Sequence, residues 1–318
     1  MDILYWVIGV LGGATLLAFI IARMNAARAA ATAPKLGPVT EVAGGALHWV
    51  EDGPENAEGP TLVCIHGRGS NLRAFTYALA PLLAKKHRVI CVDRPGSGHS
   101  KRDGAHLAPL EEQGKMIFEL LDKLGVEKPI LIGHSLGGAL SLRMAHDRPD
   151  RVSGLVLLAA ATRPVEHVPD VFKGLLVRSG ALRNFLGETF FGALAPLLGA
   201  KNAEIVFAPE PVVEGFEDRA GGVLGARPKG YIGASEDLVA AFEGSDWMRE
   251  GSVKLKVPGV VLYGSDDALL SAADHGRGFA AEHGLKYIEM PGKGHMIPLT
   301  EPEACAEAVE SLLEAVPA

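Results

Sequence analysis

The segment around Ser135 has the residue types and spacing of an activated serine nucleophile. It reads Gly-His-Ser-Leu-Gly-Gly, after the apolar run 129–132 and before a stretch with helical periodicity at 136–147. Small residues at Gly133 and Gly137 allow a sharp turn from strand to helix, which exposes the serine hydroxyl. Unpaired backbone N–H groups and the helix dipole stabilise negative charge there. The segment therefore predicts covalent catalysis on Ser135.

Two downstream segments supply the partners that a catalytic serine needs. An apolar, strand-like run at 260–263 leads into Gly-Ser-Asp-Asp, so that Asp266 and Asp267 both follow a strand. A second strand-like run at 286–290 leads into a glycine-rich loop that carries His295. A serine hydroxyl is a weak nucleophile until an imidazole removes its proton, and a carboxylate fixes the tautomer of that imidazole. Either aspartate could be this carboxylate.

The chain order of serine, aspartate and histidine, each after a strand, resembles that of the α/β-hydrolase superfamily. The resemblance is to its capped esterase, lipase and C–C-hydrolase branch and covers residues 39–316. Two further segments carry it, namely Leu-Val-Cys-Ile-His-Gly at 62–67 and Asp-Arg-Pro-Gly-Ser-Gly-His-Ser at 93–100. The resemblance implies an α/β fold with a mostly parallel, eight-stranded sheet that is flanked by helices.

Position by position, the resemblance implies a catalytic triad. It assigns the nucleophile to Ser135, the acid to Asp267 and the base to His295. The family spacing Gly-x-x-Asp, counted from Gly264, selects Asp267 over Asp266. A serine nucleophile excludes the dehalogenase and epoxide hydrolase reactions of the same superfamily, because those reactions form an ester on a carboxylate.

The resemblance also implies an oxyanion hole made of backbone groups. The N–H groups of Arg68 and Leu136 are the expected donors to the tetrahedral intermediate. Because the donor is a backbone group, the side chain of Arg68 is free for another role. Three alternatives stay open for it: contact with solvent, with a carboxylate of the substrate, or with an acid of the cap.

Alternating strand-like and helix-like segments must position these residues. The strand-like segments lie at 39–43, 46–51, 61–65, 88–92, 129–133 and 154–159, and the helix-like segments lie at 72–84, 110–124 and 136–147. Such alternation predicts a parallel sheet with helices on both faces. The alternation stops after the sixth strand. We therefore expect the hydrolase core at 39–161 and 258–318, with a helical cap inserted at 162–257.

The N-terminus carries a long apolar run. Ile3–Ala22 is uncharged, has the length that crosses the hydrocarbon core of a bilayer, and is followed by Arg23. We therefore expect a transmembrane anchor at 1–23 and a linker at 24–38. The basic residues after the run place the catalytic part on the cytoplasmic side by the positive-inside rule.

A cleavable signal peptide is the alternative, and it would make the mature protein secreted or periplasmic. Small-x-small sequences at 27–29 and 31–33 fit a cleavage site. Three features oppose this reading: no basic residue precedes the run, the run is longer than the hydrophobic region of about 7–15 residues in signal peptides, and basic residues follow it. They favour the anchor.

Composition bears on partners and cofactors. With a net charge of −7 and no basic patch that contains aromatic residues, the chain is not expected to bind nucleic acid. Its three cysteines give neither a disulfide framework nor a paired spacing of metal ligands. We expect no metal and no organic cofactor. A hydrophobic content of 48% fits a globular enzyme joined to a membrane segment.

The sequence thus predicts a membrane-anchored, esterase-like or lipase-like serine hydrolase that acts on a small-molecule ester. The membrane segment favours lipophilic acyl groups. A C–C bond hydrolase, a cofactor-free perhydrolase and an acyltransferase stay open on the same triad. A non-catalytic binding protein of the same fold is the alternative outside the enzymes, and the presence of all three triad residues argues against it.

Overall fold

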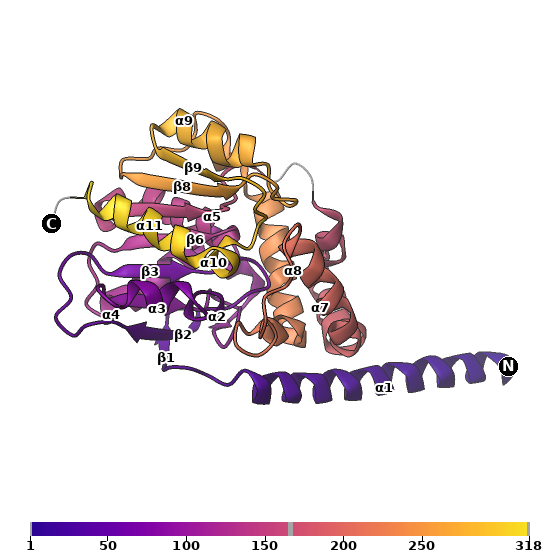
Figure 1. The fold of residues 1–318 in the computed structure, drawn as a ribbon. Coiled ribbons are helices and arrows are strands. Elements are labelled where there is room, and N and C mark those ends of the chain that lie inside the picture. Colours follow the sequence, from indigo (N-terminus) through magenta and orange to yellow (C-terminus); the bar gives the residue numbers. More distant parts are fainter. Residues whose placement is uncertain (1, 165–167, 317–318) are drawn as a thin grey trace.

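A computed structural model describes residues 2–164 and 168–316 of the chain (Figure 1). Residue 1 of the expected anchor, residues 165–167 of the expected cap and residues 317–318 of the expected core lie outside the described residues. The described residues form an α/β body and a long N-terminal helix that projects from it (Figure 1).

One sheet runs through the body. Within the described residues it contains nine strands: β1 (Val39–Val42), β2 (Gly45–Asp52), β3 (Leu62–Ile65), β4 (Val89–Val92), β5 (Lys101–Arg102), β6 (Ile130–His134), β7 (Gly154–Leu158), β8 (Gly259–Gly264) and β9 (Lys286–Met290). Their spatial order is β1-β2-β4-β3-β6-β7-β8-β9, and β5 pairs with β2. All neighbours from β4 to β9 are parallel, whereas β1, β2 and β5 pair in antiparallel fashion. The eight expected strands are present. The ninth strand, β5, was not expected, because a strand of two residues is too short to show a hydropathy pattern.

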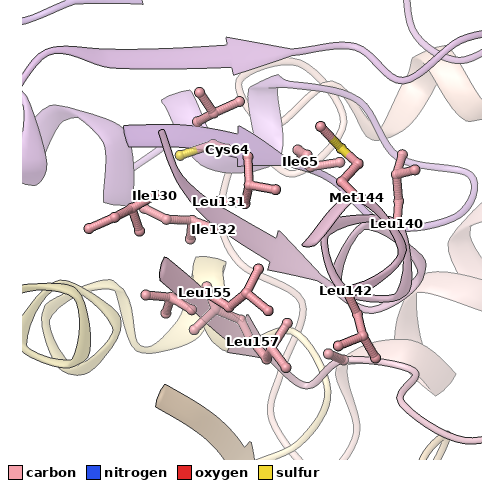
Figure 2. Close-up of a cluster of buried hydrophobic side chains, with 14 of the residues drawn as sticks. Cys64, Ile65, Ile130, Leu131, Ile132, Leu140, Leu142, Met144, Leu155 and Leu157 are labelled. Atoms are coloured by element: carbon pink, nitrogen blue, oxygen red, sulfur yellow. The ribbon is translucent and has the colours of Figure 1, made fainter. Parts of the chain in front are cut away.

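The central strands are buried along their whole length, which explains their continuous apolar runs. Figure 2 shows side chains from β3, β6 and β7 that pack together with side chains of helix α5 (Leu136–Asp147). The register pairs Cys64 with Ile132 and Leu131 with Leu155. Because the strands are parallel, their carboxyl ends meet at one edge of the sheet, where the loops that follow them gather.

Helices cover both faces of the sheet. In Figure 1, α11 (Pro302–Leu313) crosses in front of the sheet and α5 lies behind it. The helix α4 (Leu110–Lys123) packs against α5. The single helix expected at 72–84 is instead α2 (Arg73–Thr76) and α3 (Leu79–Leu83), because Pro81 cannot donate a backbone hydrogen bond to the preceding turn. Two short helices complete the core, α9 (Phe279–His283) and α10 (Ile297–Thr300).

The segment between β7 and β8 is helical and covers the carboxyl edge of the sheet (Figure 1). Its elements are η3 (Asp170–Leu175), α6 (Gly180–Leu186), η4 (Gly187–Phe191), α7 (Gly192–Phe207), η5 (Gly222–Ala226), α8 (Pro228–Glu243) and η6 (Asp246–Met248). All of them lie within the range 162–257, where the sequence predicts a cap.

Helix α1 runs from Asp2 to Thr32, so the first part of the expected linker continues the helix. Alanine is the strongest helix former, and residues 26–31 contain five alanines out of six, which accounts for the extension. Within the described ranges, two helical stretches, α1 and 180–207, have the length and apolar composition to cross a membrane, with mean hydropathies of 2.2 and 1.2.

The two halves of α1 differ in their surroundings. The large apolar side chains of residues 3–17 are exposed, whereas Ala22 and Ala29 are buried. The side chain of Asn25 donates hydrogen bonds to the carbonyl oxygens of Gly192 (3.0 Å) and Ala193 (3.2 Å) in α7. Figure 1 shows α1 passing beside α7 and then extending beyond the body. The second half of α1 is therefore part of the folded body.

Candidate active site

Ser135 lies at the junction of β6 and α5, where the strand turns into the helix. Its backbone has a φ of 53° and a ψ of −120°, a conformation that non-glycine residues rarely adopt. A Cβ atom at Gly137 would lie 2.1 Å from the carbonyl oxygen of Ile65, so only glycine lets α5 begin this close to β3. The turn holds the Ser135 side chain at the edge of a cavity.

Asp267 and His295 meet at the same edge of the sheet. A carboxylate oxygen of Asp267 lies 2.7 Å from Nδ1 of His295, and the two side chains are 0% and 5% exposed. Since the carboxylate accepts, Nδ1 carries the proton and Nε2 is left to accept one. Burial disfavours the charged form of Asp267, but His295 and the backbone N–H groups of Leu269 and Leu270 outweigh it and lower the pKa of the carboxyl.

Asp266, the neighbouring aspartate, has different surroundings. Its side chain is exposed and accepts a hydrogen bond of 2.7 Å from the hydroxyl of Ser265. Of the two aspartates, the structure brings Asp267 against His295.

His134, inside the elbow, supports the loop that carries His295. Its Nε2 donates a hydrogen bond of 2.9 Å to the carbonyl oxygen of His295. Burial, together with the nearby ring of His295, lowers the pKa of His134 to about 3, so this imidazole stays neutral. The sequence does not predict this contact, because it joins residues that are 161 positions apart in the chain.

Ser135 and His295 line one cavity of about 1600 Å³ at the edge of the sheet. This exceeds the range of about 300–1000 Å³ that is usual for small-molecule sites. Within the described part of the chain, no hydrogen bond joins the hydroxyl of Ser135 to His295. In enzymes such a bond often tightens only when the substrate is bound.

The loop after β3 lies against Ser135. A Cβ atom at Gly67 would be 3.1 Å from the Cβ of Ser135, which shows how closely the two backbones approach. Arg68 and Leu136, the two residues with the expected oxyanion donors, both line the cavity. Leu136 is the first residue of α5, so its N–H has no partner inside the helix.

The side chain of Arg68 extends over a cap residue. Its guanidinium carbon lies 5.0 Å from the centre of the Phe172 ring, and both residues line the cavity. Burial lowers the pKa of Arg68 to about 10, which leaves it charged at neutral pH. Among the described residues no carboxylate pairs with it, so a contact with an acid of the cap, one of the three alternatives for this side chain, is not seen there.

Arg94 supports the Gly67 loop from behind. Its Nε donates to the carbonyl oxygen of His66 (2.9 Å), and its Nη1 lies 2.8 Å from a carboxylate oxygen of Asp237 in α8. Asp237 also binds Arg102 at 2.8 Å. No sequence pattern predicts this link. Its only signal is the Glu-Asp pair inside an otherwise mostly apolar stretch at 231–242.

Asp93 is another buried carboxylate at the end of a strand, but it belongs to a different cluster. It lies 2.7 Å from Nδ1 of His48 and accepts backbone hydrogen bonds from Leu72 and His99, each of 2.7 Å. These contacts fix two loops, and none of them involves His295.

Part of the cavity wall comes from α1. Asn25, Arg28, Ala29 and Thr32 line the same cavity as Ser135. These residues fall in the range 24–38, where the sequence predicts a linker with no contact to the site. The segment has no catalytic motif, and only the packing of α1 on α7 brings it there.

Comparison with known proteins agrees with this architecture. The sequence profile of the α/β hydrolase fold family matches residues 60–302. The dihydrolipoyllysine-residue acetyltransferase component of the acetoin cleaving system of Pseudomonas putida is 31% identical over 265 residues, which are 83% of this chain and 65% of that protein. The chain thus spans slightly less than two thirds of that relative.

Two further similarities cover more of the other protein. The uncharacterized hydrolase YugF of Bacillus subtilis is 24% identical over 278 residues, which are 82% of this chain and 92% of that protein. A thermophilic esterase from Thermogutta terrifontis, solved with malate bound, superposes with a TM-score of 0.66 over 85% of this chain and 94% of that chain, at 22% identity. Fold, motif order and family profile agree, and the chain belongs to the α/β hydrolase fold family.

Proposed function

We propose that this chain is a serine hydrolase that cleaves carboxylic esters through an acyl-Ser135 intermediate. The observation that carries the proposal is the 2.7 Å contact between Asp267 and His295, because His295 lines the same cavity as Ser135. The strained backbone at Ser135 and the nearby N–H groups of Arg68 and Leu136 add support.

The proposed reaction has two halves. Nε2 of His295 takes the proton of Ser135 while Oγ attacks the ester carbonyl carbon, and the N–H groups of Arg68 and Leu136 stabilise the oxyanion. The carbon–oxygen bond to the alcohol breaks, and His295 gives its proton to the leaving alcohol. Water then attacks the acyl-enzyme, His295 takes its proton, and the carboxylic acid leaves as the proton returns to Ser135. Asp267 stabilises the imidazolium in both halves.

We propose further that residues 3–22 of α1 anchor the chain in a membrane, with the catalytic body on the cytoplasmic side. The exposed apolar side chains of this segment support an anchor, and the basic residues Arg23 and Arg28 after it support the orientation. In this reading residues 39–161 and 258–318 form the core, and 162–257 form the cap over the site.

Acyl transfer is the second candidate. The relative from Pseudomonas putida is described as an acetyltransferase component, although this chain spans only 65% of its length. An acyl-Ser135 intermediate would serve both reactions, because an alcohol or a thiol can replace water in the second half. Ester turnover measured with and without an added alcohol acceptor separates the two outcomes.

The test is labelling of the purified full-length protein with a fluorophosphonate probe, together with hydrolysis of p-nitrophenyl esters from acetate to dodecanoate. We expect labelling of the wild type and of Ser252→Ala, a control at an exposed serine. We expect loss of labelling and of turnover in Ser135→Ala, and strong reduction of both in His295→Ala. Folded wild-type protein that neither labels nor turns over any ester would favour a binding protein of the same fold.

A further inference from the structure

The cavity that contains Ser135 reaches the protein surface between α1 and α7. Arg28 and Thr32 of α1 line the cavity and are exposed, and so are Leu198 and Asn202 of α7. A residue that lines a cavity and is also exposed marks a place where the cavity opens. The two helices therefore form the opposite sides of one opening of the cavity, which we call the mouth and define by these four residues. Other lining residues, among them Arg249 and Asp274, are exposed as well, so the mouth is one of several openings.

Several contacts hold α1 against α7 and the turn before it. Arg23 of α1 pairs with Glu188, just before α7. Asn25 donates to the carbonyl oxygens of Gly192 and Ala193. Ala22 packs so closely on Gly192 that a Cβ atom at the glycine would lie 2.7 Å from the Cβ of Ala22. The position of the mouth relative to α1 is thus fixed by packing, charge and hydrogen bonds.

The mouth begins shortly after the apolar part of α1 ends. Arg28 lies about 9 Å beyond Ala22 along the helix axis, and Thr32 lies about 15 Å beyond it, at about 1.5 Å per residue. If residues 3–22 fill the hydrocarbon core, the polar layer, which is about 5–8 Å thick on each side of the core, ends just before Arg28. Arg28 then stands at the outer edge of the lipid headgroups, and the mouth opens at the membrane surface.

Helix α7 carries exposed apolar side chains beside the mouth. Leu194, Leu197 and Leu198 are 49%, 75% and 40% exposed, and the preceding helices expose Phe185 and Phe190. Exposed apolar patches of this kind mark contact surfaces for a protein or a membrane. A bilayer is the occupant that fits here, because the exposed apolar run of α1, which passes beside α7, has the length of a membrane span.

We propose that the mouth between α1 and α7 opens at the membrane surface and takes ester-bearing lipids directly from the bilayer into the cavity. Residues 25–32 of α1 are then both the continuation of the anchor and a wall of the lipid-binding site. The large volume of the cavity suits a long acyl chain. The hydrolysis of that lipid rests on the proposed esterase activity, whereas the position of the mouth at the bilayer rests only on the proposed anchor.

The position of the mouth can be measured without activity. Full-length Arg28→Cys and Leu198→Cys proteins, labelled with an environment-sensitive fluorophore, are placed in phosphatidylcholine vesicles that carry nitroxide quenchers at the headgroup or along the acyl chain. The native cysteines Cys64, Cys91 and Cys305 are buried, so labelling under native conditions is selective. Lys128→Cys is the control, because it is exposed and precedes β6, at the opposite edge of the sheet.

We expect bilayer quenchers to reduce the fluorescence at positions 28 and 198 by at least half and to leave position 128 almost unchanged. Equal quenching at all three positions would overturn the proposal. The proposal would also be overturned if the bilayer quenchers left the fluorophores at positions 28 and 198 unaffected and the protein self-associated through this face. The occupant of the face would then be a second copy of this chain.

A second experiment tests passage through the mouth. Thr32→Trp narrows it, and Ala31→Trp places the same side chain on a neighbouring exposed residue that does not line the cavity. The readout is the ratio of kcat/KM for p-nitrophenyl palmitate dissolved in vesicles to kcat/KM for p-nitrophenyl acetate in water. We expect Thr32→Trp to lower this ratio about tenfold, a typical size for steric discrimination.

Ala31→Trp should leave the ratio unchanged. If Thr32→Trp and Ala31→Trp gave the same ratio of palmitate to acetate kcat/KM, the proposed entry of lipids through the mouth would be overturned. If the wild type turns over neither ester and no probe labels Ser135, the proposed function fails instead, and the quenching experiment still decides where the mouth lies.

Discussion

Arg94 and Asp237 form a buried ion pair of 2.8 Å that joins the loop before the proposed oxyanion hole to helix α8. The two side chains are 0% and 1% exposed, and the same guanidinium donates to the carbonyl oxygens of His66 and Gly67. Because the buried guanidinium of Arg94 must bind all of these acceptors at once, it has one favourable position. The helix that covers the site and the loop that contributes to it are therefore positioned by one side chain.

Removal of the Asp237 charge is expected to destabilise the whole body. Asp237→Asn removes the carboxylate that pairs with the buried Arg94 and leaves Arg102 with Glu236 alone. Loss of one partner of a buried pair costs about 3–5 kcal/mol. Denaturant unfolding measures the change. Glu243→Gln, on the same helix but in an exposed pair with Arg178, is the control and should change stability by less than about 1 kcal/mol. Equal stabilities of the two variants would contradict the structural role of Asp237.

The two neighbouring aspartates should differ sharply in their effect on catalysis. Asp267→Asn keeps the shape of the side chain but favours the wrong tautomer of His295, and such a change lowers kcat by about 10⁴ in serine hydrolases. Asp266→Asn removes only an exposed carboxylate and should keep near wild-type kcat. Steady-state hydrolysis of p-nitrophenyl acetate compares them. Similar losses in both variants would show that neither the spacing nor the 2.7 Å contact identifies the acid.

Substitution of Arg68 should affect catalysis far less than substitution of Ser135. Arg68→Ala retains the backbone N–H, whose contribution to transition-state stabilisation is on the order of 10²–10³ for one oxyanion donor. Ser135→Ala removes the nucleophile, and kcat should fall on the order of 10⁶. Comparison of kcat for the two variants on one ester is the measurement. A loss in Arg68→Ala as large as that in Ser135→Ala would mean that the guanidinium itself takes part in the chemistry.

His66 should make the folded state sensitive to mild acid. Burial, with a contribution from the charge of Arg94, lowers the pKa of His66 from 6.5 to about 4. Its Nδ1 donates to the carbonyl oxygen of Gly67 (2.8 Å), and its Nε2 accepts from the N–H of Arg94 (2.9 Å), so only the neutral ring fits. Between these two pKa values the unfolded chain binds the proton and the folded chain does not. This contribution to stability is therefore complete above pH 6.5 and is lost as the pH falls toward 4.

The slope from this one residue is at most about 1.4 kcal/mol per pH unit. Thermal unfolding of the wild type, His66→Gln and His106→Gln between neutral pH and pH 4.5 measures it. We expect a shallower pH dependence of the Tm in His66→Gln than in the wild type. His106 is exposed, so His106→Gln should retain the wild-type slope. Parallel curves for all three proteins would exclude His66 as a source of acid sensitivity.

The sequence predicted those parts of the fold that depend on local pattern. The run before Ser135 and the small residues around it identify the strand–turn–helix junction, and the apolar strands identify the sheet. The roles of Ser135, Asp267 and His295 stay predictions until the variants are measured. The structure adds that Asp267 and His295 are in contact and that Ser135 lines the same cavity.

What the sequence did not reveal depends on contacts between distant residues. Arg94 and Asp237 are 143 positions apart, and nothing local marks either as the partner of the other. The strand β5 is too short to carry a pattern, and its pairing with β2 becomes visible only in three dimensions. Likewise, residues 25–32 look like an alanine-rich linker, and only the packing of α1 on α7 makes them part of the cavity wall.

That packing has a practical consequence for producing the protein without its apolar segment. A truncation that starts near residue 18 keeps Ala22, Arg23 and Asn25, and with them the contacts between α1 and α7. A truncation that starts at the first strand, near residue 39, removes one side of the cavity and uncovers the surface around Gly192. We expect the shorter protein to keep the Ser135 region and still to give a different substrate profile from that of the full-length protein. On the proposed route, long-chain esters use the wall at residues 25–32, whereas short esters do not need it.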